Sequence, residues 1–127
     1  MTSLIEHFRE GGWGMFPTLL FGAFLLAVAV RYARRPEKRL VPLLLGLGTL
    51  TMSAGALGFV SGLITTCTYI SQVQAAETTT IALQGLGESL NNVAFALLFV
   101  VVAAIAASVG ALKIARAAEA SGTAMRA

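Results

Sequence analysis

Apolar residues dominate three stretches of this chain, and only short polar segments separate them. The first two stretches cover about residues 13–32 and 40–70, and the third lies inside a predicted helix of about 79–115. Each is near or above the roughly 20 residues that a helix needs to cross a bilayer. Strands with open edges are excluded in hydrocarbon, and the alternating pattern of a membrane barrel is absent. The pattern predicts an all-α membrane protein with three transmembrane helices.

Composition supports a bilayer as the surrounding solvent. The 127 residues are 57% hydrophobic and 12% charged, with a mean hydropathy of +0.81. A soluble domain carries about 25% charged residues, so this chain has too little polar surface to cover a water-soluble globule. We expect a single integral membrane domain over residues 1–127. The end of the first stretch, VRYARR, lacks a small-x-small cleavage site, and we expect that stretch to be retained.

The basic residues predict the orientation of the helices. They crowd a short connection over residues 33–39 and reappear after the third stretch, and none lies between Gln72 and Glu88. Under the positive-inside rule, the first connection and the tail at 116–127 are cytoplasmic, and the N-terminus is outside. The residues that determine this N-out/C-in topology are Arg31, Arg34, Arg35, Lys38, Arg39, Lys113, Arg116 and Arg126.

The first residues, SLIEHFRE, place apolar side chains on one face of a helix. We expect an amphipathic helix at the outer interface over residues 1–12, ending where Gly11 and Gly12 turn the chain; a frayed polar terminus is the alternative. Pro17 and Pro42 suit the first turns of the helices that they begin. The second stretch, at 1.5 Å per residue, is about 45 Å long against a hydrocarbon core of about 30 Å, so it should tilt or project.

Several classes of chemistry have no support in the sequence. Cys67 is the only cysteine and His7 the only histidine, so neither a disulfide within the chain nor a cysteine or histidine metal motif is expected. No nucleotide-binding or hydrolase motif occurs, and basic residues do not alternate with aromatic ones. We therefore expect no enzymatic activity, no cofactor, no metal and no nucleic-acid partner.

Small residues recur at helical spacing and predict close helix packing. Helices in lipid associate through such residues, because lipid tails are as apolar as leucine. More small faces occur than one three-helix subunit needs, which predicts a homo-oligomer surrounded by membrane lipids. The packing residues are Ala54, Gly58 and Gly62 in the second helix and Ala103 and Ala107 in the third.

A polar face also follows the second helix, through Ser61, Thr65, Thr68 and Gln72. Such hydroxyls can bond a carbonyl one turn back, so helix packing and a water-accessible lumen are both open interpretations. Glu88 stands at the start of the third apolar stretch, with Asn91 and Asn92 close behind. A carboxylate deep in a bilayer is costly and indicates a site, whereas near a helix N-terminus at the interface it is simply favourable.

Three segments in this order resemble the MotA/TolQ/ExbB family. FREGGWGMFPTLLFGAFLLAVAVRYARR is similar to the family's outer amphipathic stretch, aromatic turn and Pro-led first helix. ALGFVSGLITTCTYISQ resembles its second helix, and IALQGLGESLNNVAFALLFVVVAAIAAS resembles its third. The resemblance covers nearly the whole chain, and the predicted topology agrees with it.

The resemblance implies a homo-oligomeric ring, usually of five subunits, around single-helix partners of the MotB/TolR/ExbD type. Glu88 matches the family's third-helix glutamate, and Gly58 and Gly62 match its second-helix glycines. The family's two pore threonines fall at Phe59 and Val93, which cannot relay a proton and would form an apolar constriction instead. The family's large cytoplasmic connection is reduced here to about ARRPEKR.

Two functions follow as hypotheses. The first is an ion-coupled subunit of a stator-like ring in a bacterial inner membrane, working with a single-helix partner. The alternative is a non-conducting ring or scaffold whose pore holds lipid or a partner helix. The predicted ion-pathway residues are Ser61, Thr65, Thr68, Gln72, Glu88, Asn91 and Asn92.

Overall fold

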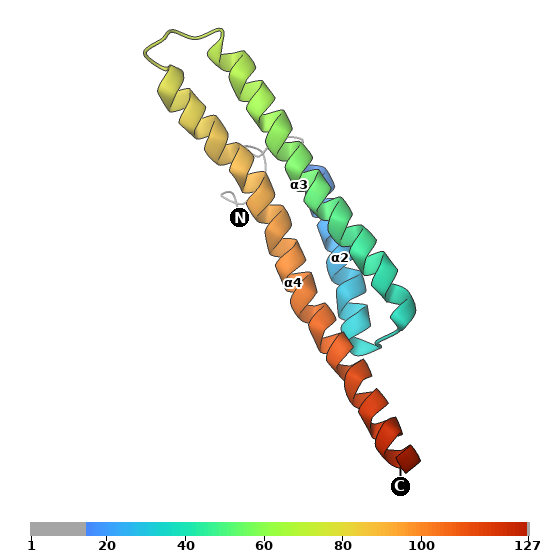
Figure 1. Cartoon of the computed structure of the whole chain (residues 1–127). Helices are drawn as coiled ribbons and strands as arrows, with labels where there is room; N and C mark the ends of the chain where they lie inside the picture. The colour runs from blue at the N-terminus through green and yellow to red at the C-terminus, as the bar shows by residue number, and fades with distance from the viewer. Residues whose placement is uncertain (1–14, 127) are drawn as a thin grey trace, which may run out of the picture.

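The computed structural model describes residues 15–126 as three long helices and one short turn. Helix α2 covers Met15–Arg34, the 3-10 turn η1 covers Lys38–Leu40, α3 covers Val41–Ile70 and α4 covers Thr78–Arg126. Each of the three helices is long and apolar enough to span a membrane. Helices α3 and α4 form an antiparallel hairpin, with α2 against the half farther from the hairpin loop (Figure 1). The predicted amphipathic helix at 1–12 lies outside the described residues.

The helix boundaries follow from local sequence signals. Pro36 lies in the short connection after α2, where a helix cannot easily continue. Pro42 occupies the first turn of α3, as expected, because its missing N–H has no partner there in any case. Glu37 and Arg39 form an ion pair in this connection. The connection between α2 and α3 is short, as predicted for the basic loop at 33–39. Helix α3 ends at Ile70, also as predicted.

Helix α4 is longer than the sequence pattern indicated. The predicted helix ended near residue 115, whereas α4 continues to Arg126 without a break. The extra segment, ARAAEASGTAM, is rich in alanine, which has the strongest intrinsic helix propensity. Loss of hydrophobicity marks where a helix leaves a membrane and does not itself end the helix. The tail thus extends past the other two helices at the C-terminal end of the molecule (Figure 1).

Small residues bring α3 and α4 into close contact from the middle of α3 toward the hairpin loop. A Cβ atom added at Gly55 would lie 2.5 Å from the Cβ of Ala96, and one at Gly58 would lie 3.2 Å from the Cβ of Asn92. Further toward the loop, Gly62 lies against Ser89 and Gly85 against Thr66. Helix α3 supplies the glycine in three of these pairs, and α4 supplies it in the pair nearest the loop. Backbones can approach this closely only because one member of each pair has little or no side chain.

Helix α2 runs parallel to α4 and is fixed to it at several points. Gly22 lies against the ring of Phe99, and Tyr32 lies against Gly110. The Lys113 ammonium donates a hydrogen bond of 2.7 Å to the backbone carbonyl of Ala33 at the end of α2. Continuing this register toward the N-terminus places Met15 level with Asn92. The described part of α2 therefore covers only the part of α4 from about residue 92 onward.

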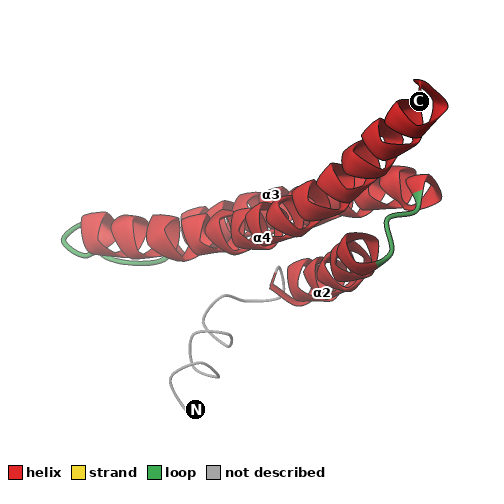
Figure 2. Cartoon of the chain, turned by 90° about the horizontal axis from the view of Figure 1, so that it is seen from below, coloured by secondary structure: helices red, strands yellow, loops and turns green. Residues whose placement is uncertain are grey.

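Among the residues that the structure describes, no third helix lies beside the hairpin beyond that level. We call this part, residues 59–70 of α3 and 78–91 of α4, the distal hairpin; it projects past α2 (Figure 1). Figure 2 shows α2 to one side of the α3–α4 pair. Helix α3 has 30 residues and α2 has 20, and the last turns of α3 run alongside the first part of α4.

The distribution of side chains is that of a membrane protein. Large apolar side chains face outward along all three helices, including Leu45 (68% exposed), Leu57 (65%) and Ile105 (63%). The buried residues are mostly small, such as Ala29 and Ala96, or are hydroxyl-bearing, such as Thr51. A soluble monomer rarely exposes so continuous an apolar surface. The three apolar helices and this surface indicate a membrane-embedded protein.

Candidate functional site

The predicted ion-pathway residues gather on the distal hairpin. Ser61, Thr65, Thr68 and Gln72, which we call the polar stripe, are all exposed on α3 and the start of the loop. Glu88 and Asn91 are exposed on the facing helix. All of these residues lie nearer the hairpin loop than Met15, the first described residue of α2. The candidate site is therefore a polar surface of two helices and not an enclosed channel within one subunit.

The two threonine hydroxyls of the polar stripe are satisfied within their own helix. The Thr65 hydroxyl donates to the Ser61 carbonyl at 2.9 Å, and the Thr68 hydroxyl donates to the Ile64 carbonyl at 2.9 Å. Such bonds make a threonine inexpensive in an apolar environment. Each hydroxyl oxygen still has a free lone pair for a water or an ion. The stripe is consequently compatible with either of the two interpretations left open by the sequence.

Glu88 borders a shallow groove between the two helices of the distal hairpin. The groove has a volume of about 410 Å³, and its walls include Thr65, Thr66 and Tyr69 from α3 and Gln84 from α4. The Gln84 amide donates to the Glu88 carboxylate at 3.5 Å, a long hydrogen bond between residues one turn apart. The structure thus brings together the predicted Thr65 and Glu88. An acidic group beside hydroxyls could accept and release a proton or hold a hydrated cation.

Asn92 lies in a different place from Asn91. Its side chain is only 3% exposed, and it packs against Gly58 in the α3–α4 interface. The reason is helical periodicity, because Asn92 follows Gly85 and Ser89 on the face that contacts α3. The structure places this predicted ion-pathway residue inside the subunit, whereas Asn91 is exposed. Gly58 faces α4 at the same place, in keeping with the helix-packing role predicted for it.

Phe59 and Val93 occupy the level at which α2 begins. Both are half-buried. The Cα atom of Val93 lies 3.7 Å from a Cβ added at Gly55, so its backbone belongs to the α3–α4 interface. Neither residue carries a hydroxyl. Within one subunit they mark the boundary between the polar distal hairpin and the apolar remainder.

The predicted packing residues face inward within the subunit. Ala54 is 8% exposed, Gly58 and Gly62 contact α4, and Ala103 is 4% exposed in a core with Leu25 and Ala29. The small face of α3 is therefore used between helices of one chain. Ala107 is half-buried, and Ala104 and Ser108 beside it are exposed. These residues of α4 are the small face that remains outside.

Sequence reasoning missed the residues of α4 that complete the α3–α4 interface. Gly85, Ser89 and Ala96 recur at intervals of four and seven residues, which place them on one helical face. The signal was present, but Gly85 and Ser89 lie in a polar segment. Their packing role appears only when paired in antiparallel order with Thr66, Gly62 and Gly55.

Among residues 15–126, the groove of the distal hairpin brings the Glu88 carboxylate and the Thr65 hydroxyl to one surface. In that range no three His, Cys, Asp or Glu side chains come together as a potential metal site. Comparison with models of known families, with curated proteins and with solved structures finds no match. The resemblance to the MotA/TolQ/ExbB family therefore stays a prediction that rests on the sequence segments themselves.

Proposed function

We propose that this chain is the subunit of a homo-oligomeric membrane ring, in which the polar surfaces of the distal hairpins face a common lumen. The observation that carries this proposal is the mixed surface of the distal hairpin. Beside the polar stripe and Glu88 it exposes large apolar side chains that α2 does not cover. These are Val60 (50%), Ile64 (62%), Leu83 (66%), Leu86 (40%) and Leu90 (50%).

A ring gives both the polar and the apolar side chains of the distal hairpin a suitable environment. Neighbouring subunits cover apolar side chains on the flanks of a hairpin, and polar side chains remain directed to the axis. Closed rotational symmetry gives every subunit the same pair of interfaces. The sequence resemblance favours five subunits around a single-helix partner in a bacterial inner membrane. In this arrangement Glu88 and Thr65 border the path of a proton or cation through the ring.

A non-conducting ring or scaffold is the second candidate, and a specific observation favours it. The positions at which the resemblance expects relay threonines are occupied by Phe59 and Val93. An apolar ring at that level blocks water. The architecture is then retained without conduction, and the pore holds lipid or a partner helix.

Proton flux into liposomes separates the two candidates. The purified full chain, with any single-helix protein that copurifies, is reconstituted and compared with Glu88→Gln, Phe59→Thr and the control Glu119→Gln. Glu119 is an exposed carboxylate in the tail of α4, far from the distal hairpin. Ion coupling predicts a loss on the order of tenfold or more for Glu88→Gln and no change for Glu119→Gln.

The opposite results assign the scaffold role. If wild-type flux equals that of empty liposomes while the chain remains oligomeric, the ring does not conduct under these conditions. If flux is present but is the same in Glu88→Gln and Phe59→Thr, this surface is not its path. Identification of the copurifying single-helix protein by mass spectrometry tests the partner directly.

A further inference from the structure

A second groove lies at the opposite end of the α3–α4 pair from the hairpin loop. Its volume is about 580 Å³, within the usual range for small-molecule sites. Helix α3 forms one wall, α4 forms the other, and Leu25 of α2 contributes from behind. We call it the apolar groove; its lining includes Leu25, Leu44, Gly48, Met52, Val100 and Ala104.

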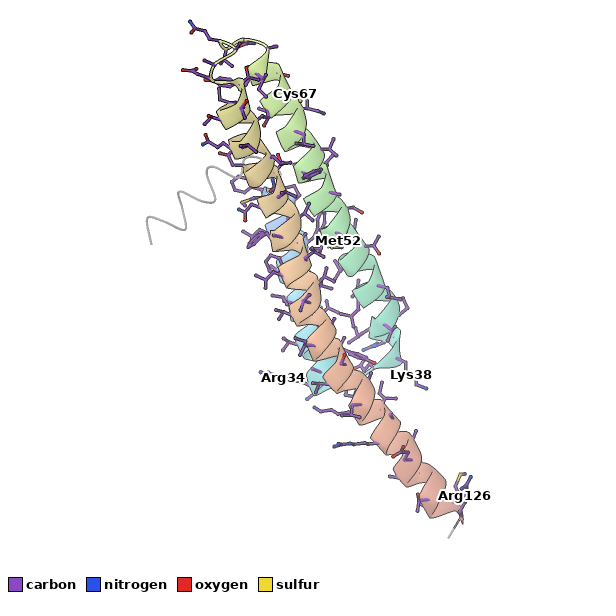
Figure 3. The ribbon with its side chains drawn as sticks, turned by 60° about the vertical axis from the view of Figure 1, so that its left-hand side comes forward. Arg34, Lys38, Met52, Cys67 and Arg126 are labelled. Carbon is purple, nitrogen blue, oxygen red and sulfur yellow. The ribbon has the colours of Figure 1, made fainter. Side chains whose placement is uncertain are left out.

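The apolar groove exists because α3 and α4 separate after their close contact. The two backbones meet at Gly55, midway along α3, and at Ala96. From there toward η1 they diverge (Figures 1 and 3). A Cβ added at Gly48 would meet nothing within 4 Å. Leu25, which is 3% exposed, packs with Ala103 at the back of the groove. The groove is therefore closed at the Gly55 end and behind, and at its other end the lining reaches Leu44, one turn of helix after η1.

The lining favours hydrocarbon over water. Most of its side chains are aliphatic, and the Thr49 hydroxyl donates to the Leu45 carbonyl at 2.9 Å within its own helix. A water molecule is stable in a buried site only when it has two to four polar partners. A flexible acyl chain requires none. Its methylene groups would restore the van der Waals contacts that the diverging helices leave unmade.

Positive charge lies close to the Leu44 end of the apolar groove. Lys38 precedes α3 by less than one turn, and Figure 3 shows it at the end of the helix pair opposite Cys67, with Met52 between the two. Lys38 is about 10 Å along the helix axis from Leu45, at 1.5 Å per residue. The N-terminus of α3 adds the partial positive charge of its backbone amides. Arg39 forms an ion pair with Glu37, whereas Lys38 is outside that pair and precedes α3 directly.

We propose that the apolar groove binds one acyl chain of an anionic phospholipid, whose phosphate lies beside Lys38 at the start of α3. The groove is closed where Gly55 meets Ala96, which suits an acyl chain that ends within the bilayer. A transmembrane helix is about 10 Å wide and continues through the membrane, so it requires a groove open at both ends. The basic residues place the headgroup on the same side of the membrane as the tail of α4.

Native mass spectrometry of the full chain with phosphatidylglycerol or phosphatidylcholine tests the proposal. Gly48→Leu fills the apolar groove, and Gly46→Leu is a matched control, because a Cβ at Gly46 also meets nothing within 4 Å but that residue does not line the groove. Wild type and Gly46→Leu should each retain one phosphatidylglycerol per chain. Gly48→Leu and, independently, Ala104→Leu should weaken retention at least several-fold while keeping the helical circular dichroism of wild type.

The headgroup contact has its own readout. Lys38→Gln should keep the bound chain but lower the preference for phosphatidylglycerol over phosphatidylcholine about fivefold, equivalent to about 1 kcal/mol. Equal retention by Gly48→Leu, Ala104→Leu and Gly46→Leu would overturn the proposal. A change in subunit number in Gly48→Leu, without a change in bound lipid, would also overturn it and assign the groove to a second copy of the chain. Lipid is counted per chain, so the result does not depend on the proposed ring.

Discussion

Gly55 of α3 and Ala96 of α4 are in such close contact that a Cβ atom at Gly55 would lie 2.5 Å from that of Ala96. This pair divides the hairpin into two parts. Toward the loop the helices remain in contact through glycine, serine and threonine, and away from it they diverge around the apolar groove. The contact thus determines where both candidate sites begin.

Gly55→Leu should destabilise the protein. The added side chain overlaps Ala96 and the Asn92 carbonyl, and overpacking of this kind costs about 1–3 kcal/mol. Unfolding by a rising mole fraction of dodecyl sulfate in mixed micelles measures the change. Gly46→Leu is the control, since it adds the same side chain on the same helix in open space. Equal stability of the two variants would show that α3 and α4 are not in close contact here.

Lys113→Met should loosen the end of α2. The ammonium group donates to the Ala33 carbonyl, one of the carbonyls left without a partner at a helix C-terminus. A net hydrogen bond contributes about 0.5–1.5 kcal/mol, so hydrogen exchange in the last turn of α2 should be several-fold faster. Arg116→Met removes another exposed cation of α4 and should leave that exchange unchanged. Identical exchange in both variants would remove the assigned role of Lys113.

Thr65→Val and Thr68→Val should leave stability within about 0.5 kcal/mol of wild type. Each hydroxyl bonds only its own helix among the contacts described, and valine keeps the branched shape. The same dodecyl sulfate titration checks this. Any loss of ion flux in these variants then reports exposure to a lumen and not misfolding. A loss of more than about 1 kcal/mol would place these side chains in an interface that holds subunits together.

The predicted topology is tested at Cys67, the single cysteine. Cys67 is exposed near the hairpin loop, and the tail of α4 lies at the opposite end of the molecule (Figure 3). In sealed cells, a membrane-impermeant maleimide should label Cys67. In a Cys67→Ser background, Ser121→Cys should be labelled only after the membrane is opened. The reverse pattern would contradict the N-out/C-in orientation.

Much of the fold was accessible from the sequence because hydrophobic length is a strong signal. The three spans, the end of α3 at Ile70 and the short connection at Pro36 all follow from apolar runs and prolines. The end of α4 did not, because an alanine-rich helix continues in water after its apolar residues end. The position of Asn92 also differs from the prediction. Asn92 lies on the same helical face as Gly85 and Ser89 and is therefore buried in the α3–α4 interface.

The candidate site was predicted less completely than the fold. Thr65 lies close to Glu88, and the polar stripe is exposed, because of the way α3 and α4 pair. The residue pattern on one helix does not determine which residues of the other helix lie opposite it. The apolar groove was not predicted at all. It arises from the divergence of two backbones after Gly55, and no local pattern in either helix indicates it.

The proposed ring makes its most direct prediction about mass. Each chain is 13.2 kDa, and native mass spectrometry of the protein extracted in a mild detergent should give a single oligomer of several chains, with five expected from the resemblance. Such a result would show that the apolar flanks of the distal hairpin are covered by neighbouring copies. A single 13.2 kDa subunit under the mildest conditions that keep the helices folded would contradict the ring.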